Sequence, residues 1–124
     1  MLPSFLIHET TVRESGESSS FSIEPYRDRN LMLTLGIMHA MEQESLDVDL
    51  FASPDGTKWP ATPVASFTRK YYCGTYQLVL SGVDGRFVKA VWKVNRWGRG
   101  EDRPFFKFYL FAQEARVCAA AGAA

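Results

Sequence analysis

The chain has 124 residues, which is the size of one domain and enough to bury an apolar core without disulfides or metals. Fourteen basic residues balance fourteen acidic ones, so a general nucleic-acid binder, which needs surplus positive charge, is excluded. The longest apolar runs fall far short of the roughly twenty residues of a membrane span, and no signal peptide is visible, so we expect a cytoplasmic or particle-associated protein.

The first third of the chain predicts three strands, at residues 5–12, 20–24 and 31–41, separated by polar segments. The third is ambiguous in composition, because its Leu, Met and Ala residues favour a helix. Its apolar residues nevertheless alternate strictly, at Leu31, Leu33, Leu35 and Ile37. Gly36 would cost a helix about 1 kcal/mol. We therefore predict a long strand, with Gly36 as a candidate β-bulge.

The remainder of the chain predicts five more strands, at residues 45–53, 64–67, 71–80, 86–95 and 104–112. Turn residues separate them, chiefly at 53–56 and 97–100. Eight strands at this spacing, with no convincing helix, predict an all-β antiparallel β-sandwich of jelly-roll type over residues 1–114. Residues 115–124 form an Ala-rich C-terminal tail.

Two of these strands carry apolar side chains on both faces. Only one face of each strand can line the core of a sandwich. If strands 86–95 and 104–112 pair with each other, their outward face carries Phe87, Val91, Phe105, Tyr109 and Phe111. Such a patch exceeds what monomers usually expose. Two explanations stay open: a protein partner covers the patch, or the N-terminal segment or the tail of the same chain does.

The loop at residues 95–103 holds Trp97 among arginines, including Arg96 and Arg99. Exposed Trp and Arg dominate binding hot spots, and they also stack on sugars or bases. The alternative is that Trp97 folds over the end of the sandwich while Arg99 and its neighbours form local ion pairs. Within the binding interpretation, a protein partner is favoured.

Catalytic chemistry is not indicated. His8 and His39 lie far apart in the sequence, and Cys73 has no evident base beside it. Two cysteines, Cys73 and Cys118, do not form a disulfide framework, and we expect free thiols. A group of carboxylates lacks the spacing of a calcium loop and is interpreted as a solvated acidic edge: Glu42, Glu44, Asp47 and Asp49. We predict no enzyme, no cofactor and no metal site.

The segment Ser53-Pro54-Asp55-Gly56-Thr57-Lys58-Trp59 resembles a hallmark of discoidin-like β-sandwiches, Ser-x-Asp-Gly-x-x-Trp after an alternating strand. The later Arg86-Phe87-Val88-Lys89-Ala90 is similar to the aromatic-Val-Arg strand of the same group. This resemblance implies a module that holds a glycan or other small ligand at its loop end. Trp59 and Trp97 would then be the stacking platforms.

A second resemblance covers more of the chain. Capsid cement proteins of bacteriophages and prophages are small jelly rolls with a similar order of strands and turns. The similar segments are residues 31–37, Asp55-Gly56, Gly74-Thr75-Tyr76-Gln77-Leu78, Phe87-Val88-Lys89-Ala90-Val91-Trp92 and Phe106-Lys107-Phe108.

This second resemblance implies an oligomeric, non-enzymatic subunit that staples larger proteins together. We therefore expect a structural or assembly subunit whose partners are protein subunits, either copies of itself or a larger assembly. Its contacts would come from the outward residues Phe87, Val91, Phe105, Tyr109 and Phe111 and from the loop residues Arg96, Trp97 and Arg99. The ligand-binding module is the alternative.

Overall fold

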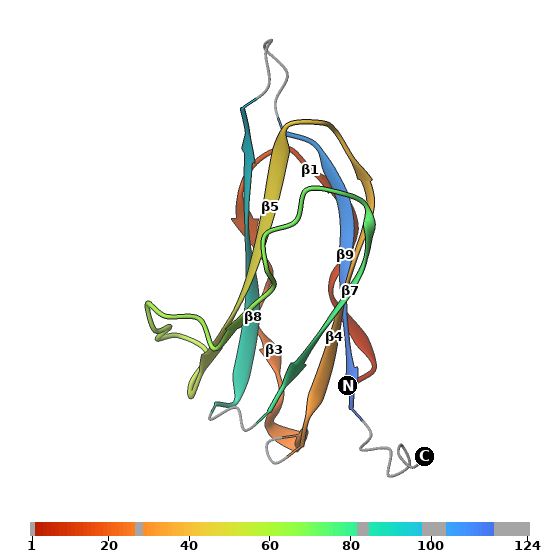
Figure 1. Ribbon diagram of the computed structural model, residues 1–124. Coiled ribbons are helices and arrows are strands. Elements are labelled where there is room, and N and C mark those ends of the chain that lie inside the picture. Colours follow the sequence, from red (N-terminus) through yellow and green to blue (C-terminus); the bar gives the residue numbers. More distant parts are fainter. Residues whose placement is uncertain (1, 27–28, 82–84, 98–103, 116–124) are drawn as a thin grey trace, which may run out of the picture.

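The computed structural model describes residues 2–26, 29–81, 85–97 and 104–115 (Figure 1). This part of the chain contains one 3-10 turn, at Glu24–Tyr26, and nine strands. The strands are β1 (Ser4–Val12), β2 (Gly16–Glu17), β3 (Phe21–Ser22), β4 (Leu31–Ala40), β5 (Glu44–Ser53), β6 (Ala65–Ser66), β7 (Gly74–Leu80), β8 (Phe87–Arg96) and β9 (Phe106–Glu114).

The strands form two antiparallel sheets that pack face to face (Figure 1). Sheet A has the order β1-β9-β4-β7, and sheet B has the order β2-β8-β5-β6, with β3 also pairing with β8. Strands that follow one another in the chain mostly alternate between the two sheets, as they do in a jelly roll. The prediction of an all-β antiparallel sandwich is thereby confirmed, and residues 31–41 do form a strand rather than a helix.

The core lies between the sheets and follows the alternation seen in the sequence. On β4, Leu31, Leu33, Leu35 and Ile37 are all buried. The largest buried side chains of the other strands include Leu46, Val48, Leu50, Val88, Phe106, Phe108 and Leu110. Each such side chain contributes about 1.5–3 kcal/mol by leaving water. The apolar residues that the alternation assigns to the inner faces therefore hold the two sheets together.

The details of the strands differ from the prediction in two places. Gly36 is not a bulge, because it pairs in regular register with Tyr109 and Thr75, and the irregularity of β4 lies between Ile37 and His39. The segment between β1 and β3, predicted to be a loop, contains β2. That strand depends on Gly16, because a Cβ there would lie 2.7 Å from the ring of Trp92. Such close packing by glycine has no signature in a hydrophobic pattern.

Candidate functional sites

The predicted patch of five outward residues does not form a single surface. β8 belongs to sheet B and β9 belongs to sheet A, so the two strands do not pair. Phe87 and Val91 face outward from sheet B, whereas Tyr109 and Phe111 face outward from sheet A. The predicted pairing of strands 86–95 and 104–112 is therefore wrong, and their outward residues lie on two separate surfaces, one on each sheet.

On sheet B, the chain itself covers part of the outer face. Phe87 lies beneath the loop that follows β5, since a Cβ on Gly56 would be 3.3 Å from its ring. Val91, further along β8, pairs with Asp49 on one side and Glu17 on the other. Both Phe87 and Val91 are half-buried. Phe87 is therefore covered within the chain, by the loop after β5 and not by the N-terminal segment or the tail that the prediction named.

The covering loop is the discoidin-like segment 53–59, and its hydrogen bonds explain its sequence. The Oδ1 atom of Asp55 accepts hydrogen bonds from the backbone N–H groups of Thr57 and Lys58, both at 2.9 Å. These bonds, the one from Lys58 foremost, hold the pKa of Asp55 well below its ordinary value. The Oγ atom of Ser53 accepts from the N–H of Gly56 at 2.9 Å, and Gly56 has a φ of 80° that favours glycine. The motif therefore has a structural role here.

Trp59 ends this loop on the outer side of sheet B. The Nζ atom of Lys89 lies 4.6 Å from the centre of its ring. Lys89 and Trp97 are eight residues apart along the extended β8, a separation of about 26 Å at the usual rise of a strand. Trp59 and Trp97 therefore lie near opposite ends of β8 and are not two platforms of one binding site.

On sheet A, a cluster of aromatic residues lies on the outer face. We call Phe5, Met38, Tyr109 and Phe111 the sheet A patch. The ring of Phe5 packs against Phe111 at 4.9 Å and against Tyr109 at 5.8 Å between centroids. Phe5 and Met38 are 39% and 51% exposed. A groove of about 350 Å³ runs between these four residues, Glu9 and Thr34.

Gly36 gives the sheet A patch its shape. A Cβ on Gly36 would lie 2.2 Å from the ring of Tyr109, so only glycine lets this ring lie flat across β4. Sequence reasoning identified Tyr109 and Phe111 but missed Phe5 and Met38. Phe5 joins the patch because β1 pairs with β9, which places Phe5 opposite Phe111. The alternating pattern of β1 would have indicated this position only if that pairing had been known.

Phe105 lies just before β9 and packs between two other side chains. Its ring is 5.0 Å from that of His39, and the guanidinium carbon of Arg13 lies 4.9 Å from its centre. Its backbone N–H donates to Glu44 Oε1 at 2.8 Å. Phe105 is thus half-buried among residues of its own chain and is not part of the sheet A patch.

A second hollow lies at one end of the sandwich. We call it the end pocket: it has a volume of about 570 Å³ and is lined by residues 40–44, residues 71–73 and Trp97. Three aromatic side chains of its lining are exposed, Tyr71 by 41%, Tyr72 by 78% and Trp97 by 54%. Trp97 is therefore open to solvent, as the binding interpretation of its loop expected. Arg99 lies outside the described residues.

One lining residue of the end pocket, Glu44, has a buried carboxylate. Glu44 is 1% exposed, and its Oε2 and Oε1 atoms accept hydrogen bonds from the N–H groups of Met41 and Phe105 at 2.6 and 2.8 Å. The predicted solvated acidic edge is thus wrong for Glu44. Arg96 pairs opposite Glu44, and its Nε and Nη1 atoms are buried without a hydrogen bond to the described residues. Arg96 faces the interior and does not line the pocket.

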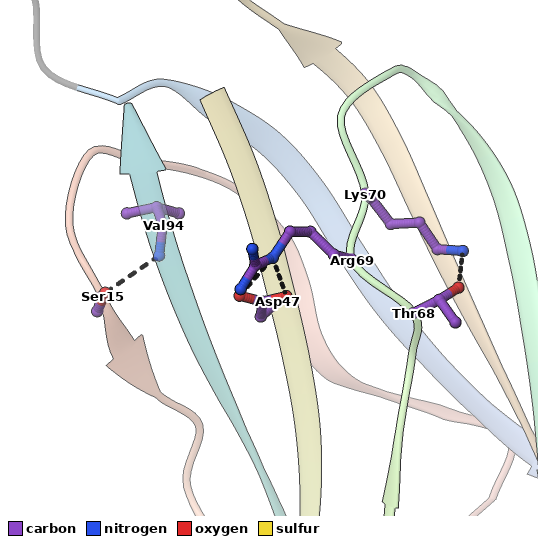
Figure 2. A network of polar contacts seen from close by, with 6 residues as sticks. All are labelled: Ser15, Asp47, Thr68, Arg69, Lys70 and Val94. Carbon is purple, nitrogen blue, oxygen red and sulfur yellow. Dashed lines mark hydrogen bonds and ion pairs between the residues drawn. The ribbon is translucent and has the colours of Figure 1, made fainter. Parts of the chain in front are cut away.

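The segment that carries Tyr71 and Tyr72 crosses from sheet B to sheet A and is fastened to β5 (Figure 1). In Figure 2, the side chains of Arg69 and Asp47 point toward each other, with Nε 3.1 Å from Oδ1. The Asp47 carboxylate raises the pKa of Arg69 above its ordinary value. Backbone hydrogen bonds between Lys70 and Leu46 run in both directions, at 2.9 and 3.0 Å. The wall of the end pocket is therefore held by side-chain and backbone contacts.

The candidates for catalysis or metal binding are not brought together. The ring of His8 packs on Phe5 at 5.2 Å, whereas His39 packs on Phe105. Cys73 is an exposed free thiol at the mouth of the end pocket, and Cys118 lies outside the described residues. Within the ranges that the structure describes, no three His, Cys, Asp or Glu residues are grouped to hold a metal ion.

No protein-family model matches the chain, and no curated protein matches it. Among the described residues, no helix has the length and hydropathy needed to cross a membrane.

Proposed function

We propose that this protein is a non-enzymatic assembly subunit that binds protein subunits through the sheet A patch, and that its first partner is a second copy of itself. The observation that carries the proposal is the group formed by Phe5, Tyr109 and Phe111 with Met38, around a groove of about 350 Å³. Aromatic residues and methionine are enriched at protein interfaces.

The rim of the sheet A patch supports a self-complementary contact. Glu9 and Lys107 lie beside the patch, with 3.5 Å between Oε2 and Nζ. A two-fold contact places the same patch against itself, so a surface that carries both signs of charge can set each carboxylate near an ammonium group of the other copy. Zero net charge also removes long-range repulsion between copies.

The resemblance to capsid cement proteins gives this proposal its more specific form, a particle-associated subunit that staples larger proteins. The jelly-roll order of the strands supports that form, because it matches the fold that the resemblance implies. The proposed binding surface differs in part from the one that the sequence predicts. Phe87 and Phe105 pack within the chain, whereas Phe5 and Met38 belong to the sheet A patch.

The test is the oligomeric state of purified protein, measured by light scattering and sedimentation at about 10–100 µM, in the affinity range where a weak interface is populated. The wild type is expected to form a dimer or larger oligomer. The double variant Phe5→Ser/Phe111→Ser is expected to be monomeric, because interface aromatic residues carry much of the binding energy. Val64→Ser is the matched control, since Val64 is 45% exposed but lies beside β6 of the other sheet.

Circular dichroism of each variant separates loss of association from loss of the fold. A monomeric wild type across this concentration range would contradict self-association. A double variant that is folded and still oligomeric would show that another surface makes the contact.

A further inference from the structure

We infer that the end pocket binds a quaternary ammonium group, such as that of choline or of a trimethylated lysine side chain. This site is separate from the sheet A patch and shares no lining residue with it. The inference stands on three features of the pocket: its rings, its charge and its rigid support.

Three exposed aromatic rings lie together in the lining of the end pocket. The centroids of Tyr71 and Trp97 are 6.1 Å apart with an angle of 77° between the planes, and those of Tyr71 and Tyr72 are 6.3 Å apart at 53°. These centroid distances are those of aromatic rings in direct contact. A cation is attracted to the face of a Trp or Tyr ring when it lies within about 6 Å of the ring centroid. A methylated ammonium group would therefore bind on the solvent-exposed side of the three rings.

The charge of the end pocket favours a cation. Glu42 and Glu44 are lining residues of the pocket, Glu42 is exposed, and none of the described lining residues is Lys, Arg or His. The remaining polar side chain of the turn is the neutral Gln43. A phosphate or nucleic-acid ligand requires basic partners and is disfavoured at such a site. A methylated ammonium combines positive charge with an apolar surface, which matches a lining of exposed rings and acidic residues.

The walls of the end pocket are held before any ligand arrives, which lowers the cost of binding. The backbone N–H of Trp97 donates to the carbonyl of Gln43 at 2.9 Å, which joins the end of β8 to the β4–β5 turn. Gln43 itself has a φ of 60°, and Glu44 fixes the turn through its bond to Met41. On the opposite wall, Tyr76 donates from its hydroxyl to the carbonyl of Tyr72 at 3.1 Å.

The experiment is a titration of the full chain with choline, followed by calorimetry and by tryptophan fluorescence. Choline is expected to bind, and 3,3-dimethyl-1-butanol, its uncharged isostere, is expected to bind at least tenfold more weakly because it lacks the charge that the rings and carboxylates attract. A peptide with trimethylated lysine, compared with its unmodified form, distinguishes a protein source of the group from a small molecule.

The variants test the individual contacts. Tyr72→Ala and Trp97→Ala are each expected to weaken choline binding about three- to thirtyfold, and Glu42→Gln about two- to tenfold. The residues are exposed, so the fold should persist. The control is Phe5→Ser/Phe111→Ser, which is expected to bind choline like the wild type, whatever its oligomeric state.

Four results would overturn the inference: no choline binding at about 10 mM, where even a millimolar site is occupied; equal binding of the uncharged isostere; full binding by the Trp97→Ala variant; or binding of a neutral oligosaccharide in place of choline, which would assign the pocket to sugars. None of these results bears on oligomerisation, so the two proposals can fail independently.

Discussion

At the scale of single residues, the side chains that most resemble a known motif stabilise the loop that carries them. Ser53, Asp55 and Gly56 satisfy one another and the backbone of the 53–59 loop, and Gly56 covers the ring of Phe87. Asp55 is the group whose ionisation the loop depends on, because its carboxylate accepts two backbone N–H bonds. Protonation would weaken both bonds at once.

This dependence predicts how stability changes with pH. The folded-state pKa of Asp55 is lowered, so its contribution is fully present above its unfolded pKa of about 3.9 and is lost as the pH falls from there toward the lowered value. Asp55→Asn removes the charge and this titration. The wild type should therefore be more stable than Asp55→Asn at pH 7, and the difference should shrink between about pH 5 and pH 2.

Urea unfolding of both proteins at several pH values measures this difference. A difference that stays constant down to about pH 2 would show that the Asp55 carboxylate does not stabilise the loop.

At the scale of elements, Glu44 connects parts of the fold that are distant in sequence. It belongs to β5 of sheet B, and its carboxylate binds the turn before it and the residue that leads into β9 of sheet A. The two sheets are thus joined by a buried polar contact at one end of the sandwich, in addition to their apolar core.

Replacement of Glu44 by Ala should destabilise the protein by about 2–4 kcal/mol, since it leaves the N–H groups of Met41 and Phe105 without their acceptor. Glu42→Ala, on the exposed part of the same turn, should change stability by less than about 0.5 kcal/mol. Chemical denaturation at neutral pH provides both values. Equal effects of the two variants would mean that water replaces the Glu44 carboxylate.

Alternation in the sequence predicts which side chains share a face, but it does not predict which strand lies next to which. In β4 the alternation correctly predicts the buried face. Its apolar residues all enter the core despite their helix-forming neighbours: Leu31, Leu33, Leu35 and Ile37. The strands β8 and β9 show that neighbouring strands are not predicted. They follow each other in the chain, yet they lie in different sheets, so the correctly predicted outward residues Phe87 and Tyr109 lie on opposite faces.

The residues of the candidate sites that the sequence did not reveal depend on contacts between distant segments. The sequence predicts that Tyr71 and Tyr72 lie in a strand, but both precede β7. Tyr71 contacts Trp97 because residues 64–73 cross between the sheets. Glu44 was grouped with exposed carboxylates, since nothing local distinguishes it from Glu42. Burial of a charged group becomes visible only when its partners, here Met41 and Phe105, are placed.

At the scale of the whole molecule, each sheet has protected central strands and open edges. β4 and β9 lie inside sheet A, and β5 and β8 lie inside sheet B, whereas β1 and β7 are the edges of sheet A. Central strands form hydrogen bonds on both sides and open only when a large part of the fold opens. Edge strands have one unpaired side.

Amide hydrogen exchange should therefore be slowest in β4, β5, β8 and β9, by a factor of about 10³ or more relative to the free-side amides of β1, if local opening differs by about 4 kcal/mol. Mass spectrometry or NMR measures these rates. Comparable rates in β9 and β1 would contradict the assignment of β9 to the interior of the sheet.

The position of β9 also determines when a nascent chain can adopt this structure. β9 is the last strand of the described sequence, yet it lies between β1, the first strand, and β4. Until a ribosome has released residues 106–114, β1 has no neighbour with which to pair, and the inner side of sheet A lacks Phe106, Phe108 and Leu110. Completion of the fold must therefore follow synthesis of β9, and a chain that stops before it would lose the middle of a sheet rather than its border.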